Sequence, residues 1–340
     1  MSAGLSLTRD PAGFSDRLPV FGTAAYLSSR SDEFGWYVGG GFALPFYIDR
    51  RAVFRRLVVT SAPVRTGDGP PCLERDFVNE FIRSIRVERR VDFIAKPQAN
   101  VVFSAPPDGC DVVDWGSYVA PLDVDDDVLL ARVQPRTRSS IRRAMRDGVR
   151  IEVTSDVGLI YSLLRDTMVR QRLPFYPSAR FLERCAANQP EIVRFYASQL
   201  PDRAQGCAVV FFNRLGGYYY YGGSIAQPHP GSMPLMHHRI MTDLRDLGVR
   251  TYDFMGARVV VEPGSRMEGI QRFKSHMGTS FVRGYSFRCV VRPFRYRLFN
   301  RVADVYLRLR GQRYAGDAID DLRRLTNGVP APGTTAPDLH

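Results

Sequence analysis

The sequence predicts an α+β fold made of two successive subdomains, each a mixed, mostly antiparallel sheet flanked by helices. Three observations support this. A length of 340 residues suits one large or two medium domains, and 44% hydrophobic with 24% charged residues is ordinary for a globular protein. Strand-like and helix-like segments alternate over the first 130 residues. The same order of elements returns, more clearly, in the second half of the chain.

The N-terminal part contains a strand–helix–strand order. Residues 42–48 (FALPFYI) and 56–64 (RLVVTSAPV) read as strands. Residues 74–85 are expected to form a helix, because Phe77, Phe81 and Ile85 recur every four residues and therefore share one face. Residues 91–95 (VDFIA) follow as the next strand.

A short basic helix marks the middle of the chain and the expected domain boundary. It spans Ile141–Arg146, after Pro135, and Gly148 stands where a C-terminal cap would fall. The expected organisation is an N-terminal subdomain (1–135), a C-terminal subdomain (136–290), a basic helical segment (291–326) and a tail (327–340). The tail is rich in Pro, Gly and Thr and is expected to be disordered.

The second half reads as helices around a meander of strands. Helices are expected at 157–170, 178–187 and 234–247, the last ended by Gly248. Strands are expected at 191–198, 206–214 and 216–224, followed by another at 250–257.

Composition limits the classes of function. The N-terminus shows no secretory signal, and no stretch reaches about 18 consecutive apolar residues, so no membrane-spanning helix is expected. The five cysteines lie far apart and form no C-x-x-C pair, and the five histidines show no ligand pattern. We therefore expect no disulfide framework, no metal site and a cytoplasmic location.

The basic residues carry two separate signals. A net charge of +12 indicates a polyanionic neighbour, such as nucleic acid, an anionic membrane face or a phosphorylated substrate; the alternative is that arginine is simply frequent. Among 47 basic side chains only Lys96 and Lys274 are lysines. A bias toward arginine does not explain Lys274, because it acts in the opposite direction.

Two stretches resemble one family of enzymes. Residues 236–278, MHHRIMTDLRDLGVRTYDFMGAR…GSRMEGIQRFKSHMG, look like the C-terminal signature of FemABX aminoacyltransferases. Residues 136–153, RTRSSIRRAMRDGVRIEV, resemble the Arg-rich helix before that family's second subdomain. The match covers roughly residues 136–285. It implies two GNAT-like acyltransferase subdomains, transfer of an amino acid from aminoacyl-tRNA to an amine, and no metal or redox cofactor.

Two departures from the family pattern leave the acceptor open. No arginine aligns cleanly after helix 157–170, where peptidoglycan-linked members hold a diphosphate. The long helical hairpin that docks on tRNA in some members is also missing. A cell-wall precursor, an amino sugar of a surface polysaccharide and a small natural product therefore all remain candidate acceptors, including phosphorylated or lipid-linked ones.

The resemblance gives Lys274 a catalytic role. Acyl transfer to an amine passes through an oxyanion, and a fixed cation aimed at that oxygen is worth on the order of 10²–10³ in rate. Lysine supplies a compact charge where the broad fork of arginine would not fit. Phe273 is expected to wall and orient it. Asp253, in YDFMG, is expected either to accept a proton from the amine or to hold the strand end.

Other residues are expected to bind substrate. Alternate members of the run Tyr218, Tyr219, Tyr220 and Tyr221 should face opposite sides of a strand, one pair in the core and one lining the acceptor channel. Ser232, at the start of helix 234–247, is either an ordinary cap or part of a site for an anion or carbonyl oxygen. The remaining expected contacts are to phosphate (Arg258, Arg266) and to tRNA (Arg138, Arg142, Arg143).

The segment 288–313 combines arginines with an apolar stripe at helical spacing. The stripe consists of Phe294, Leu298, Val302, Val305 and Leu309. Three interpretations stay open: the stripe packs on the protein with arginines outward, the helix contacts tRNA phosphates, or it lies on an anionic membrane face. The third makes the protein peripheral at the inner face of the membrane.

Three classes of function compete. The first is an aminoacyl-tRNA-dependent transferase of FemABX type. The second is a GNAT-type transferase that takes acyl-CoA, although the loop AQPHPGSMP (226–234) has a single glycine with which to approach a pyrophosphate. The third is a non-enzymatic nucleic-acid-binding protein, which would leave the acyltransferase-like motifs unexplained.

Overall fold

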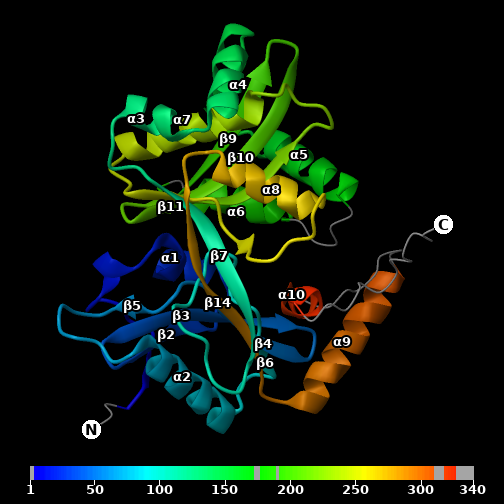
Figure 1. The fold of residues 1–340 in the computed structure, drawn as a ribbon. Coiled ribbons are helices and arrows are strands. Elements are labelled where there is room, and N and C mark those ends of the chain that lie inside the picture. The colour runs from blue at the N-terminus through cyan, green and yellow to red at the C-terminus, as the bar shows by residue number, and fades with distance from the viewer. Residues whose placement is uncertain (1–3, 172–176, 189–190, 310–317, 327–340) are drawn as a thin grey trace. The chain divides into compact units, whose positions relative to one another are not determined.

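The computed structural model of the protein describes residues 4–171, 177–188, 191–309 and 318–326. The tail 327–340, expected to be disordered, lies outside these ranges. The described chain forms two compact units, shown in Figure 1. The N-terminal unit consists of residues 1–116, 256–269 and 283–340, and the C-terminal unit of residues 117–255 and 270–282. Neither unit is one continuous stretch, whereas the two subdomains expected from the sequence are the continuous segments 1–135 and 136–290.

The N-terminal unit is built on one mixed sheet. Its strand order is β1-β2-β3-β4-β6-β14-β7, with β5 on β3 and β13 on β7. All its pairings with a described register are antiparallel except that of β4 with β6. The strands are β1 (Ser6–Thr8), β2 (Phe34–Gly39), β3 (Phe42–Arg51), β4 (Phe54–Val59), β5 (Val64–Arg65), β6 (Phe93–Ile94), β7 (Asp111–Pro121), β13 (Ala257–Arg258) and β14 (Ser280–Val290).

Helices cover this sheet. Helix α2 (Glu74–Glu88) buries Phe77, Phe81 and Ile85, which confirms the helix expected from their spacing. It ends at Arg89, which adopts a left-handed conformation with φ of 51°. The other helices of four or more residues described in this unit are α1 (Ala24–Arg30), α9 (Pro293–Arg308) and α10 (Ala318–Thr326).

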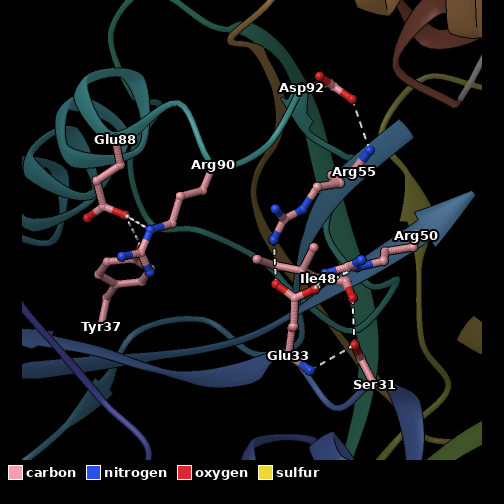
Figure 2. A network of polar contacts seen from close by, with 9 residues as sticks. All are labelled: Ser31, Glu33, Tyr37, Ile48, Arg50, Arg55, Glu88, Arg90 and Asp92. Carbon is pink, nitrogen blue, oxygen red and sulfur yellow. Dashed lines mark hydrogen bonds and ion pairs between the residues drawn. The ribbon is translucent and has the colours of Figure 1, made fainter. Parts of the chain in front are cut away.

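Polar contacts link strands β3 and β4 to the segment before β2, as Figure 2 shows. The carboxylate of Glu33 accepts hydrogen bonds from Arg50 and Arg55. Asp92, only 2% exposed, accepts the backbone N–H of Arg55 at 2.9 Å. A carboxylate so deeply buried requires partners to offset its lost hydration. Asp92 obtains a further one from Arg295 of α9, at 2.5 Å.

The C-terminal unit has a sheet of its own. The order is β7-β12-β11-β10-β9-β8, antiparallel except for β11 with β12. Strands β7 and β14 each run from one unit into the other, as does helix α8. The elements are α3 (Asp126–Arg132), α4 (Pro135–Arg146), β8 (Arg150–Thr154), α5 (Val157–Arg170), α6 (Ala179–Asn188), β9 (Val193–Leu200), β10 (Arg203–Asn213), β11 (Gly216–Ser224), α7 (Ser232–Asp246), β12 (Thr251–Asp253) and α8 (Arg266–Ser275).

Helix α7 is the centre of this unit's core. Its apolar residues Leu235, Met236, Ile240 and Leu244 are all buried, as their helical spacing predicts. Its N-cap, Gly231, lies against α4: a Cβ at Gly231 would stand 2.1 Å from the carbonyl oxygen of Ser140. Only glycine permits this close approach of the two helices.

The α+β fold expected from the sequence is confirmed, with local differences. The segment 250–257 is not one strand: β12 ends at Asp253, and the chain turns before β13. Strands β2, β7 and β14 were not anticipated. Within the described residues, no helix is long and apolar enough to cross a membrane.

Candidate active site around Lys274

Lys274 is a buried cation at the end of helix α8. Its residue surface is 8% exposed, and its ammonium donates a hydrogen bond to the carbonyl oxygen of Met255. Burial lowers the pKa of Lys274 to about 8, while the nearby charge of Asp253 raises it. The last turn of a helix favours positive charge, because the helix dipole is negative there. Lys274 is therefore placed to hold a proton near neutral pH at a site from which water is largely excluded.

The turn after β12 directs the Met255 carbonyl toward this ammonium. Met255 has a φ of 53°, in the left-handed region that non-glycine residues rarely adopt, and Gly256 follows with the same value. The side chain of Asp253 accepts the Met255 N–H at 2.6 Å. This contact and the bond from Lys274 hold a backbone conformation that would otherwise be unfavourable.

Asp253 is the buried acid of the site. It is 8% exposed and accepts a hydrogen bond from the hydroxyl of Ser117 on β7. Burial raises the pKa of Asp253 to about 6, an effect opposed by Ser117, the Met255 N–H and the charge of Lys274. Between about pH 6 and pH 8, the site thus contains a carboxylate and an ammonium together.

His237 of α7 is fully buried beside this pair. Burial and the charge of Lys274 lower its pKa to about 3, so its imidazole is neutral. Nδ1 lies 3.0 Å from the Tyr252 hydroxyl, and Nε2 has no hydrogen-bond partner within the described part of the chain. The five histidines show no ligand pattern in the sequence, and His237 is a buried one in contact with the candidate site.

Aromatic rings surround His237. Phe273, the neighbour of Lys274 on α8, lies 5.4 Å from the His237 ring and 6.4 Å from that of Phe254, between centroids. Tyr219 meets the same imidazole edge-on at 4.4 Å. This apolar surround is the reason that the neighbouring charges are poorly hydrated.

The tyrosine run on β11 is interrupted by a β-bulge. Tyr221 pairs with Val209 and Tyr219 with Val210, so Tyr220 is the extra residue. Tyr218 pairs with Asp253, whereas Tyr220 and Tyr221 pack on each other at 4.6 Å. All four are half-buried. The regular alternation expected from a flat strand therefore does not hold through this run.

Ser232 is the fully buried first residue of α7. Its hydroxyl has no hydrogen-bond partner among the described residues. Gly231, not Ser232, is the N-cap of the helix, so the capping alternative for Ser232 is wrong. The N–H groups of Ser232 and Leu235 donate to the carbonyls of His229 and Gly231, and Pro234 has no N–H.

The arginines expected to bind phosphate or tRNA are dispersed. Arg258 pairs with Asp321 of α10 at 2.6 Å in the N-terminal unit, to which the exposed Arg266 also belongs. On α4, Arg138 donates to the Ala131 carbonyl at 3.3 Å and Arg143 pairs with Asp147, while Arg142 is exposed.

Sequence reasoning missed Ser117 and Tyr252 as members of the site. Ser117 lies 136 positions from Asp253 on a strand that was not anticipated. No local pattern marks it. Across the described ranges, no group of three or more histidine, cysteine or acidic side chains is arranged to hold a metal ion.

Comparisons with known proteins identify the fold. A family model described as an acetyltransferase (GNAT) domain matches residues 132–275, which include most of the site. The solved structure of FemX superimposes with a TM-score of 0.61, covering 85% of this chain and 96% of FemX, at 13% identity. The chain has a FemABX-like GNAT fold. The resemblance noted in the sequence is thus confirmed at the level of fold.

Two other solved structures share the fold. One is the C-terminal domain of a putative lysylphosphatidylglycerol synthetase from Agrobacterium fabrum, with a TM-score of 0.51, 17% identity, and coverage of 82% of this chain and 91% of that one. The other is a protein of unknown function from Bacteroides thetaiotaomicron, with a TM-score of 0.54, 9% identity, and coverage of 84% and 99%. No curated protein sequence matches the chain significantly.

Proposed function

We propose that this protein transfers an aminoacyl group from aminoacyl-tRNA to an amine and so forms an amide bond. The observation that carries the proposal is the buried ammonium of Lys274, held by a strained backbone turn within a GNAT-type acyltransferase fold. The similarity to FemX and to a protein whose name refers to a lysylated phospholipid favours an aminoacyl donor.

The reaction needs a group that stabilises negative charge. The amine nitrogen attacks the ester carbonyl that joins the amino acid to the ribose of tRNA, and the carbonyl oxygen becomes an oxyanion. When the intermediate collapses, the C–O bond breaks, the ribose oxygen takes up a proton, and the amine loses one. In this proposal Lys274 stabilises the oxyanion, because a poorly hydrated ammonium interacts more strongly with a developing charge than a solvated one.

Asp253 supports this role in two ways. By accepting the Met255 N–H it fixes the turn that holds Lys274, and its negative charge favours the protonated form of the lysine. With a pKa of about 6, it is also suited to receive the proton lost by the amine near neutral pH. Phe273 is proposed to pack against the ammonium, and members of the run Tyr218 to Tyr221 are proposed to line the acceptor channel.

The contacts at the start of α7 favour aminoacyl-tRNA over acyl-CoA as the donor. A pyrophosphate is held at a helix N-terminus by free backbone N–H groups. Here Pro234 lacks an N–H, and those of Ser232 and Leu235 already donate to backbone carbonyls. Few donors therefore remain for the pyrophosphate of CoA. A protein that only binds nucleic acid would not require a buried lysine held by this turn.

The acceptor is proposed to be an amine of cell-envelope or natural-product chemistry, phosphorylated or lipid-linked acceptors included. Arg138, Arg142 and Arg143 are proposed as tRNA contacts, and Arg258, Arg266 and Ser232 as contacts to substrate. The protein is proposed to act in the cytoplasm, where charged tRNA is available.

The donor is tested by incubating the protein with labelled aminoacyl-tRNA or acyl-CoA and a panel of amines. We expect label to leave tRNA and appear in an amide in the presence of an acceptor. Lys274→Ala should reduce this rate by about 10²- to 10³-fold. The matched control is Lys96→Ala, which removes the other lysine of the chain, stacked over Trp115 at 3.8 Å in the N-terminal unit.

The outcomes separate the three classes of function. Release of free thiol from acyl-CoA, with aminoacyl-tRNA left intact, would show that acyl-CoA is the donor. Salt-sensitive tRNA binding without transfer to any amine would favour a nucleic-acid-binding protein. Equal transfer rates in Lys274→Ala and Lys96→Ala would remove the lysine from the mechanism.

A further inference from the structure

Among the described residues, helix α9 packs on the rest of the N-terminal unit through one face. Tyr296 and Phe299 meet Phe93 with ring centroids 4.9 and 5.2 Å apart, and Phe299 also contacts Phe54 at 5.4 Å. Leu307, 3% exposed, continues the same face. These contacts fix which side of the helix is turned toward the protein.

The apolar stripe of α9 lies on the opposite side. Its members are 40% to 83% exposed: Phe294, Leu298, Val302, Val305 and Leu309. At 100° per residue they occupy a sector of about 80°, centred away from the packed face. The interpretation that the stripe packs on the body of the protein is therefore wrong, because Tyr296, Phe299 and Leu307 do so instead.

Ion pairs hold α9 in this orientation. Arg295 donates to the buried carboxylate of Asp92 at 2.5 Å, and the side chain of Arg292 lies 3.8 Å from the same oxygen. The backbone N–H of Arg292 also donates to the Asp92 carbonyl at 2.9 Å. A helix anchored by a buried charge and aromatic packing presents its apolar stripe as a fixed feature of the surface (Figure 1, where α9 is orange).

Arginines line one edge of the stripe. Arg297, Arg301 and Arg308 are exposed and project within about 60° of Phe294 around the helix axis. Asp304 is the one acidic residue of α9, and it pairs with Arg308 at 2.8 Å. Among the described residues Arg297 and Arg301 form no ion pair, so their charges remain available to an external anion.

We propose that α9 is a docking surface for an anionic lipid bilayer, lying flat with its apolar stripe in the headgroup region. A helix with exposed apolar side chains, flanked by arginines and fixed parallel to the protein surface, has the pattern of interfacial membrane helices. The arginines complement anionic headgroups, and the stripe gains by leaving water. This surface is distinct from the Lys274 site and does not depend on the proposed transfer reaction.

The apolar stripe argues against nucleic acid as the partner of α9 and against self-association of the protein through this helix. A nucleic-acid phosphate chain would be met by charge, and about five exposed apolar side chains would gain nothing from it. A second copy of this helix would bring the same excess of arginines and no unpaired acidic side chain of α9 to neutralise them, and like charges at an interface are unfavourable.

The test measures co-sedimentation of the full chain with vesicles of phosphatidylcholine alone or mixed equally with phosphatidylglycerol. We expect binding to the mixed vesicles that weakens with added salt and is much lower on phosphatidylcholine. The variant Phe294→Ser/Leu298→Ser should bind at least about tenfold more weakly, because both side chains lose their insertion energy. Arg297→Gln/Arg301→Gln should lose the preference for phosphatidylglycerol.

Matched controls carry the same changes on other surfaces. Val87→Ser alters a 78% exposed valine of α2, and Arg146→Gln an exposed arginine of α4; both should bind vesicles like the wild type. Circular dichroism and thermal unfolding should be unchanged in all four variants, because none of the altered side chains is buried.

Contrary results identify another occupant. Equal binding by Phe294→Ser/Leu298→Ser and wild type, or no binding to anionic vesicles, would overturn the proposal. A dimer seen by light scattering that this variant dissociates would assign the stripe to a second copy. Lys274→Ala should keep full vesicle binding, so that failure of the transfer assay and failure of this proposal remain distinguishable.

Discussion

Two buried cations in this molecule, Arg288 and Lys274, differ in the groups that surround them. Arg288 of β14, 4% exposed, is held in the N-terminal unit by Asp111 and Asp320, each at 2.8 Å, and lies 5.1 Å from the ring centroid of Tyr296. Lys274, 8% exposed, donates to a backbone carbonyl and has Asp253 as the nearby charge that favours its protonation.

The difference separates a structural charge from a reactive one. Arg288 has two carboxylates in ion-pair contact, so its burial is compensated by charge and by geometry. For Lys274 the effect of burial on the pKa exceeds that of the nearby Asp253 charge, and the pKa falls to about 8 as a result. Strongly shifted pKa values of this kind gather at functional sites, because a group that is not fully neutralised can respond to a substrate.

The largest expected effect comes from changing the shape of the reactive cation while keeping its charge. Lys274→Arg should lose about 10²-fold or more in transfer rate, because a planar guanidinium does not place its charge at the Met255 carbonyl. The measurement is kcat with labelled aminoacyl-tRNA, beside a thermal unfolding curve. Wild-type kcat in this variant would show that any cation suffices.

The reverse pattern is expected at the structural cation. Arg288→Met leaves Asp111 and Asp320 without their shared partner, and loss of one member of a buried ion pair typically costs about 3 kcal/mol or more of unfolding free energy. Transfer per folded molecule should be unchanged. Denaturant unfolding measures the first quantity. A variant as stable as the wild type would show that Arg323, which also pairs with Asp111, supplies enough counter-charge.

The smallest expected effect is a shift in pH dependence. Transfer should fall below about pH 6, where Asp253 takes up a proton, and above about pH 8, where Lys274 loses one. The hydrogen bond from Ser117 lowers the pKa of Asp253, so Ser117→Ala should move the acid limb to higher pH and leave the alkaline limb in place. A profile of kcat/KM against pH for both proteins measures this. Movement of the alkaline limb alone would contradict the assignment.

The fold was predictable where local pattern decides structure. Helix α5 and strand β11 have the bounds read from the sequence, because periodic apolar residues and flanking glycines specify them. Strand β14 was not predicted, because residues 280–290 mix charged, aromatic and apolar side chains without alternation. Its place in the sheet is set by distant partners such as Ile94, which pairs with Cys289.

The candidate site was predictable only in part, for a similar reason. Lys274 is conspicuous because it departs from the composition of the chain. The left-handed turn at Met255 is invisible in sequence, because methionine gives no sign of positive φ. His237 was placed on the correct helix, but its contact with Tyr252 depends on packing between α7 and β12. The apolar stripe on α9 was recognised in the sequence. That it faces away from the protein was not, because Tyr296 and Phe299 pack against Phe93 in its place.

The scarcity of lysine has a consequence for a protein proposed to handle activated esters. The chain has two primary side-chain amines, and neither is exposed: Lys274 is buried, and Lys96 is half-buried against Trp115. Guanidinium groups, protonated at any physiological pH, do not attack an ester. Such an enzyme would be a poor acceptor for its own donor, and little of the activated amino acid would be lost on the surface that carries it.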